Sequence, residues 1–221
     1  MRQAPCKDWN TDDPTAILRI VANIRDLWPQ VEAAAISRPR PSLALALEWH
    51  RRVYAGVAVP EPDYVGHVRD SDPQHPCLID YEVSVGTQPG IRARDVPKAL
   101  EDFIHATSTI TDALDAAVDP GTIPHQHREV LAIVRLCAHA HGEWVRIHPF
   151  ANGNGRTARI WANWLAVRYG LPPFVRINPR PDDLMFIGAA ALSMRANHEA
   201  TVALFTSLLR QALAESLPAT D

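Results

Sequence analysis

The N-terminal quarter of the chain carries apolar residues at the three- and four-residue spacing that is typical of one face of an α-helix. Thr11-Asp12-Asp13-Pro14 offers a capping side chain and a proline for a first turn, and Pro29 is expected to end that helix. After a proline-rich break, Ser42 is placed to cap the next one. We interpret residues 1–58 as an N-terminal helical segment packed on the core. Its expected helices cover 17–28, 31–37 and 43–54.

Most of the remaining chain has the same helical periodicity. The stretch 125–146 is apolar around much of its circumference, so we expect it to be the central buried helix. Gly170 and the prolines that follow are expected to end the helix after it. The expected helices cover 96–118, 125–146, 155–169, a stretch from 182 onward, and 198–217.

Residues 60–90 interrupt this helical pattern, because they are dense in Pro, Gly and Asp. They include one convincing strand pattern, 78–85, which ends before Gly86. We therefore expect one small β-hairpin, which could be an ordinary surface feature. The fold class predicted for the chain is all-α with that single hairpin.

Length and charge narrow the class of protein. A chain of 221 residues can bury one substantial core, so one domain is expected. The net charge of −3 and a pI of about 6.4 argue against a nucleic-acid partner. The sequence holds no apolar run long enough to span a membrane and begins with a polar stretch. We expect a cytoplasmic protein.

Cysteine and histidine positions predict no metal centre. Cys6, Cys77 and Cys137 are widely spaced and odd in number, which suits a reducing compartment. We expect Cys137 to be a small core residue and Cys6 to be exposed near the chain end. The histidine pairs at 125 and 127 and at 139 and 141 diverge on a helix, so neither pair chelates one ion readily.

Residues 148–159, which read HPFANGNGRTAR, carry the strongest chemical signal. A glycine-rich loop that opens into a helix directs backbone N–H groups towards an anion. Arg156 and Arg159 fall one turn apart on one helix face, and guanidinium groups match phosphate geometry. His148 is placed to accept a proton from a nucleophile. The run therefore predicts a polyphosphate site beside a general base.

This run resembles the Fic/Doc family signature His-x-Phe-x-(Asp or Glu)-Gly-Asn-Gly-Arg-x-x-Arg, and seven of its eight defined positions agree. Gly66-His67-Val68-Arg69 is similar to the lead-in to the family's flap, and a weaker resemblance extends over about 64–210. The resemblance implies a Fic-type helical bundle over 59–221. Its β-hairpin flap would lie at about 64–90 and its active-site loop at 148–159.

The resemblance also implies a reaction, the transfer of AMP from ATP to a hydroxyl group of a target protein. His148 would be the general base, and Arg156 would act with it by binding the phosphates. The cofactor-binding residues would be Phe150 beneath the loop, the anion cradle Gly153, Asn154 and Gly155, and the arginines Arg156 and Arg159. The target would dock on the flap at Asp80–Gly86 by strand addition.

Asn152 is the one departure from the signature, since the family usually has a magnesium-binding carboxylate there. An amide oxygen can still bind Mg²⁺, but without charge. The alternatives are therefore a catalytically weakened or non-catalytic nucleotide-binding module, or an enzyme with another phosphate-containing donor. Gly155 favours nucleotidyl transfer, because the phosphate-transferring branch has Lys at that position.

Two further expectations concern regulation and the pocket rim. No glutamate follows Ser or Thr by four positions with Gly or Asn after it, which is the family's inhibitory pattern. Any restraint on Arg159 is thus expected from a separate antitoxin-like chain, as in bacterial toxin–antitoxin pairs. His141 is expected to pack behind the pocket. Arg176, Asn178 and Arg180 are candidates for its border.

Overall fold

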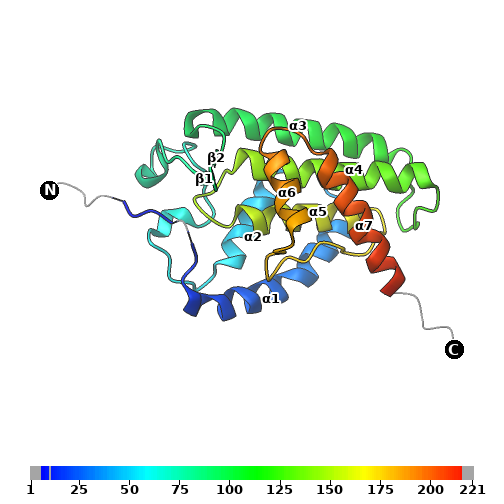
Figure 1. Cartoon of the computed structure of the whole chain (residues 1–221), viewed down its shortest axis with the longest axis horizontal. Helices are drawn as coiled ribbons and strands as arrows, with labels where there is room; N and C mark the ends of the chain where they lie inside the picture. The colour runs from blue at the N-terminus through cyan, green and yellow to red at the C-terminus, as the bar shows by residue number, and fades with distance from the viewer. Residues whose placement is uncertain (1–5, 10, 216–221) are drawn as a thin grey trace.

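The computed structural model describes residues 6–9 and 11–215, and folds them into seven α-helices and one two-stranded antiparallel sheet (Figure 1). The all-α class with one small hairpin is confirmed. No helix in this described part is both long and apolar enough to cross a bilayer. The elements are α1 (Ile17–Ile36), α2 (Leu43–Val53), β1 (Ser84–Val85), β2 (Gln88–Pro89), α3 (Val96–Asp115), α4 (His127–Ile147), α5 (Asn154–Arg168), α6 (Leu184–Ser193) and α7 (Glu199–Glu215).

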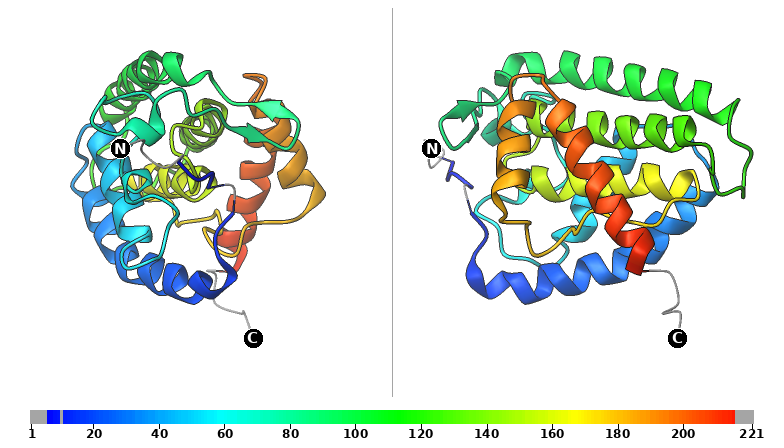
Figure 2. Two further views of the ribbon diagram at one scale, coloured as in Figure 1. Left: turned by 90° about the vertical axis from the view of Figure 1, so that its left-hand side faces the viewer. Right: turned by 45° about the vertical axis from the view of Figure 1, so that its right-hand side comes forward.

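Helices α4 and α5 form the centre of the fold, and the other helices surround them (Figure 2). Helix α4 packs against α3, α5, α6 and α7, as expected for the stretch 125–146. Helix α5 is more enclosed still, because nearly every one of its residues is buried, including polar ones such as Asn163. Four tryptophans fill the core between these helices: Trp49, Trp144, Trp161 and Trp164.

The break expected at Pro29 is wrong, because α1 continues through this residue to Ile36. A proline inside a helix removes one backbone hydrogen bond and costs about 3 kcal/mol. Helix α1 nevertheless keeps one buried stripe on both sides of the proline, with Leu27 before it and Val31 after it. Packing of this stripe on the core outweighs the local cost.

The strand expected over 78–85 is also largely wrong. Pro76–Leu78 is a 3₁₀ turn, Asp80 has a left-handed backbone with φ of 52°, and only Ser84–Val85 pairs with Gln88–Pro89. Leu78 is buried and the carbonyl of Tyr81 accepts a hydrogen bond from Arg69. Leu78 therefore packs into the core and the Tyr81 carbonyl bonds to a buried arginine, so neither residue pairs with a neighbouring strand. The region remains a hairpin, but a very short one.

A segment before α1, residues 6–9 and 11–13, runs across the hairpin region, and we call it the strap. Cys6 forms a disulfide with Cys77, so two of the three cysteines are not free thiols. The argument from cysteine usage for a reducing compartment therefore no longer holds. Cys137 is a buried free thiol, as expected.

The strap is also held by polar and aromatic contacts. The Tyr64 hydroxyl donates to the Lys7 carbonyl at 2.8 Å, and the Trp9 N–H donates to the Tyr81 hydroxyl at 2.9 Å. Trp9 is buried, and its ring lies edge-on to Tyr54 at 4.7 Å. The strap is thus part of the packed structure and positions Thr11 and Asp12 beside the candidate site.

Candidate active site

The loop between α4 and α5 reverses the chain so that the N-terminus of α5 faces a pocket. His148 ends α4 with a left-handed backbone, φ 53°, and Gly153 has φ 80° immediately before α5. A Cβ on Gly153 would lie 2.8 Å from the Tyr54 ring and 3.0 Å from His50. Glycine is required there both for the backbone angle and for the close approach of these side chains.

His148 has the protonation state of a general base. Its Nδ1 lies 2.9 Å from the Val145 carbonyl, which can only accept, so Nδ1 carries the proton and Nε2 has a free lone pair. Burial, opposed by this hydrogen bond, lowers the pKa of His148 to about 4, and the nearby Arg69 charge adds to the lowering. The imidazole is therefore neutral and able to accept a proton at neutral pH.

Arg69 holds the backbone on both sides of this histidine. Its guanidinium donates to the carbonyls of Ile147 at 3.1 Å and His148 at 2.9 Å, and also to the carbonyls of Tyr81 and Ile91. The Arg69 side chain is fully buried. Because Tyr81 and Ile91 flank the hairpin, this one side chain connects the hairpin to the base. The only indication of this role in the sequence was the position of Arg69 in the motif that resembles the lead-in to the family's flap.

The loop itself is braced by an amide and two rings. The Asn154 side chain exchanges two hydrogen bonds of 2.8 Å with the backbone of Phe150. Phe150 lies beneath the loop, as expected, and stacks on His50 at 3.9 Å. His50 accepts from the Gly66 N–H and donates to the Asn152 carbonyl at 3.0 Å. No sequence pattern pointed to His50, which lies about 100 residues from the loop.

The two signature arginines have different partners. Arg159 is buried and donates through Nε and Nη2 to the Ile177 carbonyl at 3.0 and 2.9 Å. Burial and then the charges of neighbouring arginines, Arg156 first, lower the pKa of Arg159 to about 9, so it stays cationic at neutral pH. Arg156 instead donates to the Tyr54 hydroxyl and forms an ion pair with Asp12.

Asp12 brings a carboxylate to the position where the signature lacks one. Besides Arg156, the Tyr54 hydroxyl donates to Asp12 Oδ1 at 3.2 Å and the Asn152 amide Nδ2 donates to it at 3.3 Å. Asn152 Oδ1 accepts from the Gly153 N–H at 2.6 Å. The sequence could not indicate a role for Asp12 in the site, because the pattern around Asp12 predicts only the start of a helix. The capping side chain is in fact its neighbour Asp13.

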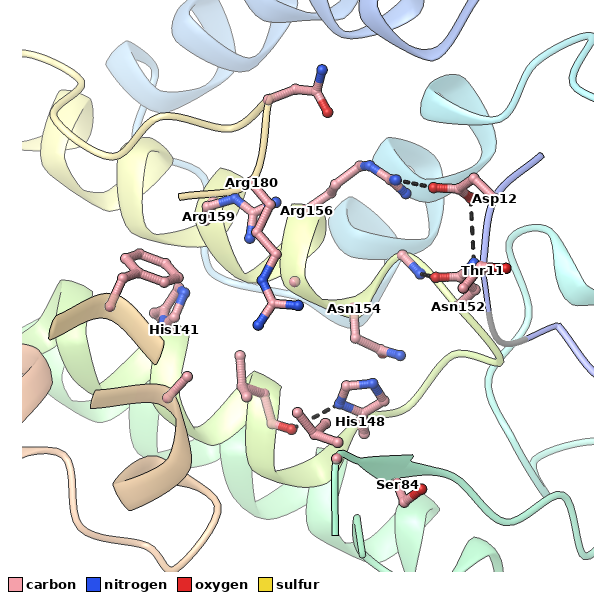
Figure 3. Close-up of a pocket in the computed structure, with 18 residues that line it drawn as sticks. Thr11, Asp12, Ser84, His141, His148, Asn152, Asn154, Arg156, Arg159 and Arg180 are labelled. Carbon is pink, nitrogen blue, oxygen red and sulfur yellow. Dashed lines mark hydrogen bonds and ion pairs between the residues drawn. The ribbon is translucent and has the colours of Figure 1, made fainter. Parts of the chain in front are cut away.

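These groups line one cavity of about 420 Å³ between the strap, the hairpin and α4 to α6 (Figure 3). The glycine loop and His148 lie on its wall with Asn154, and Ser84–Gly86 border it beside the histidine. Asn178 and Arg180 also line it, whereas Arg176 borders a neighbouring cavity. The structure thus brings together the site residues expected from the sequence with two exceptions: Phe150 supports the loop from below, and Arg176 lies outside this cavity.

His141 lies at the back of this cavity, as expected, and packs edge-on against Phe186 and Phe205. Burial lowers its pKa to about 3, so the ring is neutral. Within the described residues, no group of three or more His, Cys, Asp or Glu side chains is arranged to hold a metal ion. A cation here would need ligands from a bound substrate.

Comparisons with known proteins agree with this geometry. The chain is 35% identical over 96 residues to protein adenylyltransferase Fic of Nematostella vectensis and 29% identical over 129 residues to protein adenylyltransferase fic-1 of Caenorhabditis elegans. These matches cover 43% and 58% of this chain but only 20% of each relative. The match therefore spans about a fifth of the length of each of these two curated relatives.

Solved structures show the same fold at low identity. A fragment of C. elegans Fic-1 superposes with a TM-score of 0.58 at 20% identity, covering 89% of this chain and 50% of that one. The effector BepC of Bartonella tribocorum, solved with bound AMPPNP, gives 0.59 at 16% identity, covering 89% and 87%. The model of the Fic/DOC family matches residues 41–166, more than half of the sequence. With the glycine loop, the base and the paired arginines in place, this chain belongs to the Fic/DOC family.

Proposed function

We propose that this protein transfers AMP from ATP to a hydroxyl side chain of a target protein. The observation that carries the proposal is the neutral His148, with its lone pair on Nε2, in the same cavity as Arg156, Arg159 and the N-terminus of α5. A base next to an anion-binding cradle is the arrangement that nucleotidyl transfer to a hydroxyl requires. The names of the adenylyltransferase relatives support the same reaction.

Each of these residues has a separate role in the proposed reaction. His148 Nε2 takes the proton of the target hydroxyl, whose oxygen forms a bond to the α-phosphorus while the bond from that phosphorus to the bridging oxygen breaks. Pyrophosphate leaves with the electron pair. Arg156, Arg159 and the first N–H groups of α5 hold the charge that develops on it. Arg69 and Asn154 fix the loop, so the base and cradle keep their relative positions.

A divalent cation fits the donor groups of this cavity. Among the described lining residues, the Asp12 carboxylate beside Arg156 is a hard oxygen ligand of the kind Mg²⁺ prefers, whereas the Asn152 amide oxygen accepts from the Gly153 N–H. When bound, Mg²⁺ would neutralise part of the phosphate charge.

The hairpin is the proposed docking site for the target protein. Ser84–Gly86 border the cavity next to His148, and β1 is only two residues long (Figure 3). We propose that an extended target segment lies along Asp80–Gly86 and so brings its hydroxyl to the base. In the described part of the chain, no carboxylate pairs with Arg159. We propose that inhibition through that arginine needs a separate antitoxin-like chain.

One observation favours a second candidate, a weakened or non-catalytic nucleotide-binding module. Position 152 has no carboxylate, and Asp12 already neutralises Arg156. Such a module would bind ATP without transferring any part of it. A Fic enzyme with a different phosphate-containing donor is the remaining alternative.

The test uses purified protein, a cell lysate as a source of targets, Mg²⁺, and ATP labelled at either the α- or the γ-phosphate. We expect protein labelling that depends on His148 from the α-position alone. His148→Ala should reduce it by roughly 10²- to 10⁴-fold, the usual contribution of a general base. His105→Ala, an exposed histidine on α3, is the matched control. Label from the γ-position that His148→Ala removes would contradict AMP transfer, and no His148-dependent label despite ATP binding would favour the non-catalytic module.

A further inference from the structure

Asp12 is the one acidic group among the described residues that line the cavity, and three arginines line it as well: Arg156, Arg159 and Arg180. Its carboxylate does not point to solvent, since it bonds with Arg156, Asn152 and Tyr54. A negative charge is therefore built into the wall of a pocket that is otherwise suited to anions. The phosphate-binding role proposed for these arginines does not explain this charge.

A polyphosphate bound to Arg156 would bring several negative charges next to this carboxylate. Like charges at such short range in a partly buried site repel strongly. Two arrangements relieve the repulsion: the strap carries Asp12 out of the pocket, or a cation lies between the carboxylate and the phosphates. The contacts that hold the strap in place decide between these two arrangements.

The strap is fixed on both sides of Asp12. Before it, the Cys6–Cys77 disulfide, the buried Trp9 ring and the Trp9 hydrogen bond to Tyr81 attach the chain to the hairpin region. After it, Asp13 accepts from the Thr15 N–H at 2.8 Å and begins the turn that leads into α1. Removing Asp12 would break these contacts, so a cation between carboxylate and phosphate is the better solution.

The orientation of Asn152 agrees with this. Its Oδ1 is used by the Gly153 N–H, so the side chain presents its N–H group, not its oxygen, to Asp12. Asn152 therefore acts here as a donor that positions the carboxylate. A carboxylate at 152 would instead repel Asp12, which gives a physical reason for the pairing of amide and acid.

We propose that Asp12, presented by the strap and held by Asn152, is the carboxylate ligand of a divalent cation that bridges to the nucleotide phosphates. This inference rests on the proposed function only in taking a nucleotide as the ligand. One carboxylate with phosphate oxygens and water is the usual environment of Mg²⁺ in nucleotide sites. The cation should therefore bind with the nucleotide and only weakly alone.

The experiment measures how strongly Mn²⁺, as a probe for the cation, tightens binding of α,β-methylene-ATP, which cannot be cleaved at the reacting bond. Affinity is determined calorimetrically with Mn²⁺ and with chelator, and the ratio of the two affinities is the coupling. Asp12→Asn should reduce this ratio by at least about tenfold, the smallest loss usual for groups at a metal site. Asp13→Asn, the neighbouring acid outside the cavity, should leave it unchanged.

A rescue variant separates ligand loss from misfolding. Asn152→Asp in the Asp12→Asn background should restore most of the coupling, because it returns a carboxylate to the same place. An unchanged ratio in Asp12→Asn would overturn the inference. So would tighter nucleotide binding by that variant with the Mn²⁺ ratio unaffected, since Asp12 would then be an occluding group. Asp12-dependent coupling without AMP transfer would leave this inference standing and remove the proposed function.

Discussion

The glycine loop and the strap meet in one pocket, yet they are built in opposite ways. The loop places its base, glycines and arginines within twelve consecutive residues, 148–159. The partners that fix these groups come from far along the chain: Asp12 lies 144 positions from Arg156, and Arg69 lies 79 from His148. A local motif therefore specifies which chemistry is present, whereas distant residues determine its charge balance and its geometry.

The comparison predicts different consequences for the two regions. Changes in the loop should alter activity or nucleotide affinity with little effect on folding. Changes in the distant partners should reduce stability first. Variants in both regions test this distinction, and after His148→Ala the largest effect is expected at Arg69.

The largest effect on stability is expected from Arg69→Met. The change leaves four carbonyls, all buried or partly buried, without this donor, and the free energy of unfolding should fall by about 3–5 kcal/mol. Urea unfolding followed by circular dichroism measures it, with the exposed Arg176→Met as control. Equal stability of the two variants would show that the distant contacts of the base are dispensable.

Loss of the Cys6–Cys77 disulfide should have the next largest effect. The bond closes a loop with a sequence separation of 71, and such cross-links usually contribute about 2–4 kcal/mol. Unfolding of Cys6→Ser, and of the unmodified protein with and without reductant, should show this difference. Cys137→Ser serves to detect effects of the buried free thiol. A stability that does not respond to reductant would mean that the strap is held by Trp9 and its neighbours alone.

Arg156→Gln tests the loop region and should leave the fold intact. Hydrogen bonds to a charged group contribute about 1.5–3 kcal/mol, so ATP affinity should fall by roughly 10- to 150-fold. The variant also leaves Asp12 without its ion pair, which adds repulsion towards the phosphates. Calorimetry beside Arg176→Gln gives the comparison. An equal affinity in both variants would place the phosphates elsewhere.

The smallest effect concerns pH. Burial lowers the pKa of His148 to about 4, so the imidazole stays neutral, and competent as a base, down to that pH. AMP transfer should therefore decline as pH falls through about 4. A histidine with the ordinary pKa of 6.5 would already lose about fourfold at pH 6. Initial rates between pH 5 and 8 distinguish the two profiles, and a decline centred near 6.5 would contradict the buried geometry.

Stability has its own pH dependence, which has to be measured beside these rates. Burial also lowers the pKa values of His50 and His141, to about 3. The unfolded chain then binds protons that the folded chain does not between about pH 6.5 and 3. The free energy of unfolding should decrease as pH falls through this window, so rates are comparable only where unfolding curves show a folded protein.

The accuracy of the sequence-based predictions follows the same division. Helices α2 to α7 follow from periodicity and breaker residues, because an apolar face at helical spacing is a local signal. Pro29 was read as a break, since its local cost is visible in the sequence and the burial of Leu27 and Val31 is not. The prediction of a strand over 78–85 failed because Leu78 packs into the core and the Tyr81 carbonyl accepts a hydrogen bond from Arg69.

The sequence by itself determined the family signature, the helical class and the candidates for the base and the phosphate-binding arginines, because these depend on residues close together in the chain. Only the tertiary structure decided that Arg156 is paired with Asp12, that Arg69 and His50 brace the loop, and that Cys6 is bonded to Cys77. Each of these contacts joins residues 71 to 144 positions apart. Their approach depends on the packing of the whole helical core, which no local pattern encodes.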